Sequence, residues 1–90
     1  MTRADAEALA RIAPVLRQLR DIKGVREERP GIFYAGRETF VNFQSDGDAL
    51  FAELRKSGGS GFDRYPLETP AQQRKLVDDA RLRAGRLQDD

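Results

Sequence analysis

The chain of 90 residues contains no cysteine and no histidine. Without them it can form no disulfide framework, no thiolate nucleophile and no zinc site of the usual Cys/His kind. Ser-His and Cys-His nucleophilic catalysis and histidine general-base catalysis near neutral pH are excluded as well. The commonest enzyme mechanisms are thus closed to the chain, and we expect no metal or other cofactor. Binding is favoured over catalysis, and any catalysis would be limited to chemistry that Asp, Glu, Lys, Arg or Tyr can perform.

Long apolar runs and an excess of one charge are also lacking. No apolar run approaches the roughly 20 residues that a membrane span needs, and the first ten residues carry acids where a signal peptide needs a basic flank and an apolar core. The net charge is only +1, too small for bulk steering toward nucleic acid or an anionic membrane. We expect a cytoplasmic protein without membrane contact, in which any nucleic-acid site would have to be local.

The composition is that of an ordinary globular domain, with 39% hydrophobic and 34% charged residues. A chain of this length forms one domain, residues 1–90, and buries roughly 60 to 65% of its unfolded surface. Such a domain folds alone without much margin, so oligomerisation would help it.

Apolar residues at helical spacing predict a first helix between Thr2, as its N-cap, and Gly24, as its stop. Pro14 lies inside this segment and removes a helical hydrogen bond, at a cost of about 3 kcal/mol unless the helix bends. We expect a kink near Ala13 or a frayed first turn. The expected apolar stripe is Leu9, Ile12, Leu16 and Leu19.

Residues 26–44 predict two strands joined by a two-residue turn at Gly36-Arg37. With Ala35 opposite Glu38, this register places Phe33 opposite Phe40 and sorts the side chains into two faces. The more continuous apolar face, expected to lie against the helices, holds Ile32, Tyr34, Thr39, Val41 and Phe43. The other face holds Phe33, Glu38, Phe40, Asn42 and Gln44.

Residues 44–59 predict a second helix with the stripe Leu50, Phe51 and Leu54, capped within Asp46-Gly47-Asp48 and ended by Gly58-Gly59. Residues 61–67 predict a short third strand, placed at an edge because Pro66 cannot donate to a ladder. A last helix begins with Thr69 as cap and Pro70 as its first residue. Its expected buried stripe is Leu76, Val77, Ala80, Ala84 and Leu87.

The predicted fold is therefore α+β: a small antiparallel sheet of three strands, in the order helix-strand-strand-helix-strand-helix, with the helices packed on one face. A three-stranded sheet is stable only when one face is covered. The uncovered face would then carry an aromatic pair beside uncharged amides, a surface suited to a ligand or a protein partner. We assign this surface to Phe33, Phe40, Asn42, Gln44 and Tyr65. The alternatives are that a helix or a second copy covers it, or that the register is off by one and the faces exchange.

Residues 40–43, FVNF, match the end of the RNA-recognition-motif signature, but the first half of that signature is absent. Alternation along a strand also sends Phe40 and Phe43 to opposite faces. A local basic stripe on the last helix, with Arg74, Arg81 and Arg83, is an alternative contact for anions or nucleic acid, together with arginines of the first helix.

Several short segments resemble a group of small bacterial α+β proteins whose family name includes "luciferase-like domain". They are Gly24-Val25, Pro30-Gly31, Phe40-Val41, Leu50-Phe51 and FDRYP at residues 62–66, and the resemblance covers most of residues 24–80. It implies the fold but no light emission. Members carry histidines around the position of Phe43, where this chain has Asn42 and Gln44. Because amides are poor transition-metal ligands and do not act as bases, we carry over no activity.

From these observations we predict a small cytoplasmic binding or interaction module that associates with itself through its sheet, as a homodimer. Its further partner would be an unidentified protein or small molecule. Nucleic-acid or anion binding through the helix arginines is the alternative.

Overall fold

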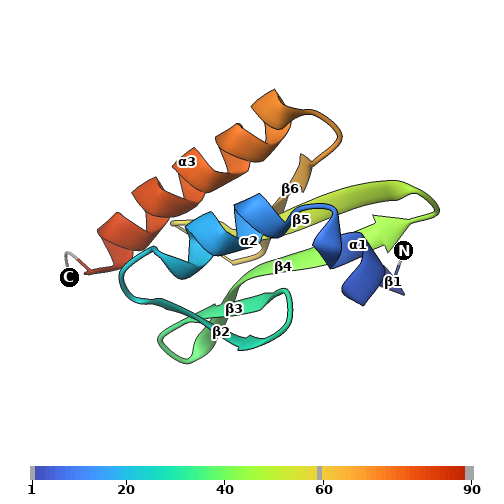
Figure 1. Ribbon diagram of the computed structural model, residues 1–90. Coiled ribbons are helices and arrows are strands. Elements are labelled where there is room, and N and C mark those ends of the chain that lie inside the picture. The colour runs from blue at the N-terminus through green and yellow to red at the C-terminus, as the bar shows by residue number, and fades with distance from the viewer. Residues whose placement is uncertain (1, 59, 89–90) are drawn as a thin grey trace.

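The computed structural model describes residues 2–58 and 60–88. In chain order the elements are β1 (Thr2–Arg3), α1 (Ala6–Ala10), α2 (Ala13–Arg20), β2 (Val25–Arg29), β3 (Ile32–Ala35), β4 (Glu38–Asp46), β5 (Ala49–Arg55), β6 (Phe62–Pro66) and α3 (Pro70–Gln88). Figure 1 shows the three helices on the same side of the sheet. Within the described residues, no helix has the length and apolar character needed to cross a membrane.

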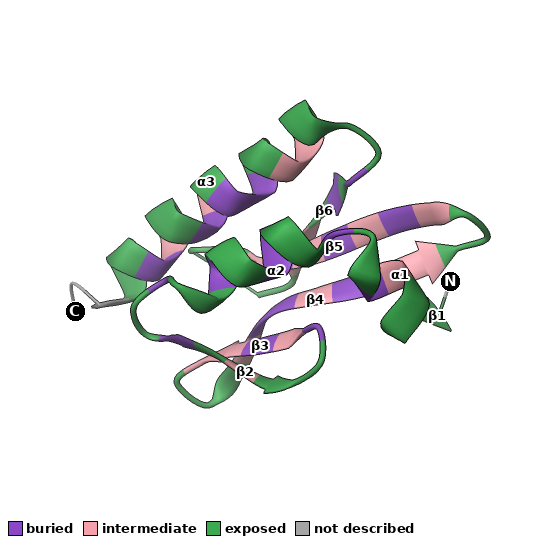
Figure 2. Cartoon of the chain, viewed as in Figure 1, coloured by how far each residue is buried: buried purple, intermediate pink, exposed green. Residues whose placement is uncertain are grey.

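The sheet is antiparallel and has six strands, five of which form a meander. Its order is β2-β3-β4-β5-β6, and the two residues of β1 pair with the end of β4. Residues along the central strands alternate between buried and half-buried, as the colours of Figure 2 show. The sheet therefore has one face toward the helices and one face toward solvent.

The core lies between the sheet and the helices. Phe33 of β3 and Phe43 of β4 meet edge to face, with ring centroids 6.4 Å apart. The helices contribute buried aliphatic side chains that cover these rings, namely Val15, Leu16 and Leu19 from α2 and Leu76, Val77, Ala80 and Ala84 from α3. This single cluster also includes Leu50, Ala52 and Leu54 of β5.

The predicted arrangement of three strands is wrong, because residues 49–55 form strand β5 and not a helix. Asp46 and Ala49 are partners in the ladder, so Gly47-Asp48 is a two-residue hairpin turn. Gly47 has φ +62°, the left-handed conformation that the first position of a type II′ turn requires. Buried and half-buried residues then alternate along the whole strand. The predicted helix would instead have buried Leu50, Phe51 and Leu54 together on one side.

A further strand, β2, precedes the predicted hairpin. Pro30 and Gly31 form its turn into β3, with Arg29 opposite Ile32. Pro30 presets the first turn position, and Gly31, with φ +77°, occupies the second, as in a type II turn. The charged sequence of β2 suits an exposed edge strand better than a buried one.

The predicted face assignment holds for Val41, Asn42, Phe43 and Gln44 but is wrong before them: Ile32, Tyr34 and Thr39 face solvent, and Phe33 and Phe40 face the core. Ala35 lies opposite Glu38, as expected, but a β-bulge then places Phe33 opposite Val41. The extra residue is Phe40, and a bulge turns two successive side chains to similar sides. Phe33 and Phe40 are therefore 0% and 1% exposed in the core.

Other local predictions are confirmed. The first helical segment breaks before Pro14, at residues 11–12, so α1 and α2 replace one kinked helix. β6 is an edge strand. Thr69 and Gln72 cap α3 reciprocally: Gln72 N donates to Thr69 Oγ1 at 3.1 Å, and Thr69 N donates to Gln72 Oε1 at 3.0 Å.

Two end positions differ from the prediction. Thr2 belongs to β1, and Asp5 caps α1 by accepting a hydrogen bond from Ala8 N at 2.9 Å. Leu87, near the end of α3, is 44% exposed and is not part of the core.

Candidate functional site

The solvent side of the sheet, called the open face below, is formed by the outward side chains of the strands. These side chains are half-buried or exposed, in contrast to the buried ones between them. The register places on this face Arg3, Arg26, Arg29, Ile32, Tyr34, Thr39, Asn42, Gln44, Asp46, Ala49, Phe51, Glu53, Arg55, Phe62, Arg64 and Pro66, and Glu28 joins them through its bond to Arg26.

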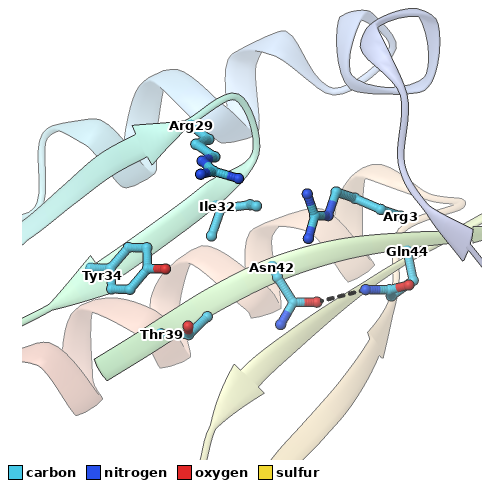
Figure 3. Close-up of a pocket in the computed structure, with 7 residues that line it drawn as sticks. All are labelled: Arg3, Arg29, Ile32, Tyr34, Thr39, Asn42 and Gln44. Atoms are coloured by element: carbon cyan, nitrogen blue, oxygen red, sulfur yellow. Dashed lines mark hydrogen bonds between the residues drawn. The ribbon is translucent and has the colours of Figure 1, made fainter. Parts of the chain in front are cut away.

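A hollow of about 370 Å³ lies in the open face. It is lined by Arg3, Arg29, Ile32, Tyr34, Thr39, Asn42 and Gln44. Figure 3 shows the guanidinium groups of Arg29 and Arg3 on either side of the space next to Ile32, with Arg29 above Ile32 and Arg3 to its right. The lining combines two guanidinium groups, two amides and two hydroxyls, and it contains no carboxylate. We call it the arginine hollow.

Arg3 reaches the hollow because β1 pairs with the end of β4. Its ladder partner is Gln44, and the next residue, Ala4, donates a backbone hydrogen bond to Phe43 O at 3.1 Å. Ala4 is buried, so the segment is held on the sheet by packing as well as by hydrogen bonds. The pairing places the Arg3 side chain next to that of Gln44.

Arg29 is positioned by the turn between β2 and β3. The backbone N–H of Gly31 donates to Glu27 Oε2 at 2.9 Å, and Glu27 Oε1 lies 2.6 Å from Arg20 Nε of α2. The pKa of Glu27 is lowered: burial opposes this shift, but the hydrogen bonds from Arg20 and Gly31 outweigh it. The turn is therefore tied to α2 through a carboxylate that stays ionised.

The floor of the hollow carries a paired set of amides. Gln44 Nε2 donates to Asn42 Oδ1 at 3.1 Å, as the dashed line in Figure 3 marks. This bond uses the acceptor of Asn42 and a donor of Gln44, which leaves the Asn42 NH₂ group and the Gln44 carbonyl oxygen for other partners. The two amides together offer a donor and an acceptor to a ligand.

The charges of the hollow are uncompensated. Among the residues that the structure describes, neither Arg3 nor Arg29 has a hydrogen-bond or ion-pair partner. Guanidinium groups match carboxylate and phosphate oxygens in geometry and bind them by charge-assisted hydrogen bonds. The hollow thus has the chemistry of an anion site.

The predicted ligand surface falls into two parts. Asn42 and Gln44 do face outward, in the arginine hollow. Phe33, Phe40 and Tyr65 lie in the core instead, so their assignment to an open face is wrong. The bulge at Phe40 accounts for the two phenylalanines, and Tyr65 faces α3 because it pairs with the inward Ala52.

Tyr65 belongs to a polar cluster that joins β6 to α3. Its hydroxyl donates to Asp79 Oδ2 at 2.6 Å, and Arg83 Nη2 lies 2.9 Å from Asp63 Oδ2 and 3.3 Å from the Tyr65 hydroxyl. Burial, followed by the hydrogen bond to Asp79, raises the pKa of Tyr65 to about 12. Each of these groups has a hydrogen-bond or ion-pair partner. We therefore interpret the cluster, called the clasp below, as a contact that holds β6 and α3 together and not as a binding site.

The predicted helix arginines are not gathered into one site. Arg83 is engaged by Asp63 and by the backbone carbonyl of Arg55, while Arg74 and Arg81 are exposed on α3. Anion contact through Arg74 and Arg81 stays a prediction. Within residues 2–58 and 60–88, no group of three or more acidic side chains is placed to hold a metal ion.

Five residues of the hollow were missed by sequence reasoning: Arg3, Arg29, Ile32, Tyr34 and Thr39. A two-residue strand such as β1 leaves no periodic signal, so nothing marked Arg3. The Pro30-Gly31 pair between two short runs was a usable turn signal, and it would have placed Arg29 and Ile32 opposite each other.

Comparison with known proteins places the chain in no established group. No family model, no curated protein and no solved structure matches it. The resemblance to luciferase-like-domain proteins stays a prediction, and the hollow has to be interpreted from its own chemistry.

Proposed function

We propose that the protein is a small binding module whose arginine hollow holds an anionic group, a phosphate or a carboxylate, of a small-molecule partner. One observation carries this proposal: two guanidinium groups without partners among the described residues line one hollow that contains no carboxylate. Unpaired like charges near each other favour a bound anion that neutralises both.

The size and the neutral groups of the hollow support a partner larger than a bare ion. Its volume of about 370 Å³ lies in the range of small-molecule pockets. Tyr34 and Thr39 add hydroxyls, and Asn42 and Gln44 add a free donor and a free acceptor, as few and fixed polar groups that can orient a ligand. Ile32 adds an apolar contact.

The residues that line the hollow favour binding over catalysis. The lining includes no carboxylate, histidine or thiol that could accept or donate a proton near neutral pH. A partner held there would be recognised and released unchanged.

Isothermal titration calorimetry at low salt tests the proposal with three probes: inorganic phosphate, adenosine monophosphate and succinate. We expect at least one of them to bind, and the double variant Arg3→Gln/Arg29→Gln to bind at least tenfold more weakly, because a charge-assisted hydrogen bond is worth about 1.5–3 kcal/mol.

The matched control is Arg17→Gln/Arg81→Gln, which removes the same charge from exposed helix positions. It should bind like the unmodified protein. Equal weakening in both double variants would mean that only overall charge matters, and the absence of binding by all three probes would contradict an anion site.

A further inference from the structure

Three aromatic side chains lie on the open face outside the core. Tyr34 lines the arginine hollow from β3, Phe51 comes from β5, and Phe62 comes from the edge strand β6. Each is half-buried rather than buried. Their rings are thus available to solvent on the side of the sheet away from the helices.

An arginine lies over each of these rings. The guanidinium carbon of Arg26 is 5.9 Å from the centroid of Tyr34, that of Arg64 is 5.4 Å from Phe51, and that of Arg55 is 4.8 Å from Phe62. Cation–π pairs of this kind form flat, charged platforms. Bases stack on aromatic rings and on guanidinium planes alike.

The platforms continue from the hollow across the sheet. Arg3, Gln44, Phe51 and Pro66 are successive partners on β1, β4, β5 and β6, so Phe51 is the direct neighbour of a residue that lines the hollow. Phe62 and Arg55 are partners in the same ladder, further along these two strands. Four residues along a strand span about 13 Å, so Phe51 and Phe62 can take bases that are not adjacent along one strand of nucleic acid.

The open face carries more basic than acidic side chains. Its ionisable side chains include five arginines, Arg3, Arg26, Arg29, Arg55 and Arg64, and three carboxylates, Glu28, Asp46 and Glu53. Glu28 pairs with Arg26 at 2.8 Å, and Glu38 lies 3.6 Å from Arg55. Arg3, Arg29 and Arg64 have no ion pair among the described residues and are left for a polyanion.

From these observations we infer that the open face binds single-stranded nucleic acid, with a backbone phosphate in the arginine hollow and bases stacked across β5 and β6. This inference rests on the proposed function, since it names the partner class to which the anionic group belongs. Positive charge that follows the backbone, combined with rings on which successive bases stack, is the general means of binding single strands without sequence readout.

The charge pattern decides against other occupants of the open face. A second copy packed face to face would bury six arginines that are unpaired among the described residues, three from each copy, against only four such carboxylates, Asp46 and Glu53 of each copy. A duplex hides its bases from a flat platform, so it would use the charges but leave the rings unused. An acidic peptide would likewise match the arginines but not the three ring platforms.

We expect dissociation constants on the order of 10⁻⁵ M near 0.1 M salt, because the contacts are few and not sequence-specific. Two phosphates, one held in the hollow by Arg3 and Arg29 and one at Arg64, predict a slope of about −1.4 in a plot of the logarithm of affinity against the logarithm of salt concentration. Removing Arg3 and Arg29 should flatten that slope by about 0.7.

Fluorescence anisotropy with a labelled 12-residue oligo(dT) tests the inference over a series of salt concentrations. Phe51→Leu and Phe62→Leu, which keep apolar side chains on the strands, should each weaken binding about tenfold, because stacking on a lost ring disappears. Arg64→Gln should weaken binding and reduce the salt slope by about 0.7. Arg17→Gln/Arg81→Gln should leave both quantities unchanged, and circular dichroism checks that every variant is folded.

The competitors separate this inference from the function on which it rests. A 12-base-pair duplex and polyglutamate should compete at least tenfold less well than unlabelled oligo(dT). Equal competition, unchanged affinity of Phe51→Leu and Phe62→Leu, or loss of binding only in the helix variant would each overturn the inference.

Binding of adenosine monophosphate in the hollow without binding of oligo(dT) would overturn the inference while the anion site stands. No binding of either probe would overturn both.

Discussion

At the residue scale, the arginine hollow depends on a glycine that carries no functional group. Gly31 has φ +77°, and a Cβ atom added there would lie 2.9 Å from Leu9 Cδ2, a buried side chain of α1. The backbone N–H of the same residue is bonded to Glu27. One position thus fixes the turn against α1 and α2 and holds the neighbouring Arg29 in place.

Gly31→Ala is therefore expected to destabilise the protein by about 2–3 kcal/mol and to weaken anion binding. Left-handed backbone costs a non-glycine residue about 1–2 kcal/mol, and the contact with Leu9 adds to this cost. Urea denaturation measures the change. Gly36→Ala is the matched control, because Gly36 also has a left-handed φ of +65° but nothing within 4 Å of an added Cβ atom. Equal destabilisation by both substitutions would contradict the role given to the Leu9 contact.

At the scale of elements, α3 is held to the sheet by its apolar stripe and by the clasp around Tyr65. Because the pKa of Tyr65 is raised to about 12 in the folded state, the fold favours the protonated phenol. This contribution is fully present below the ordinary pKa of about 10. It is lost as the pH rises from about 10 toward 12.

Tyr65→Phe should lower the free energy of unfolding at neutral pH by about 1 kcal/mol, since it removes the hydrogen bond to Asp79. It should also make the loss of stability above pH 10 shallower than in the unmodified protein. Urea denaturation at a series of pH values measures both effects, with Tyr34→Phe as the control for a phenol on the open face. An unchanged pH dependence in Tyr65→Phe would show that the clasp does not carry this linkage.

Several features of the helices and strands could be predicted from the sequence, and one could not. The break at Pro14, the edge strand β6 and the capping box of α3 follow from local chemistry, and each was predictable. Strand β5 was not assigned, because Leu50, Phe51 and Leu54 fit a short helical stripe as well as a strand, and only the Gly47 turn with its ladder separates the two readings.

The candidate site was harder to predict than the fold. Asn42 and Gln44 were recognised as outward residues, but the bulge at Phe40 inverted the expected placement of the aromatic residues beside them. A bulge has no reliable sequence signature, and it reverses the faces of everything on one side of it. Arg3 and Arg29 come together with these amides only through long-range pairing, which no local pattern encodes.

At the scale of the whole molecule, the open face bears on self-association. The homodimer expected from so small a domain would, if formed through this face, bring unpaired arginines together. We therefore expect a monomer at low micromolar concentration and low salt, as measured by size-exclusion chromatography with light scattering. Addition of oligo(dT) should shift the mass by one bound strand. A stable dimer without added ligand in which the open face is buried would contradict the assignment of this face to an anionic partner.

The central claim is that the arginine hollow binds an anion. A proton-nitrogen NMR titration of labelled protein with adenosine monophosphate at low salt tests it most directly, because it reports both binding and place. The account predicts shifts that cluster at Arg3, Arg29, Asn42 and Gln44 and that disappear in Arg3→Gln/Arg29→Gln. Shifts confined to Arg74, Arg81 and their neighbours on α3, or the absence of any shift, would contradict it.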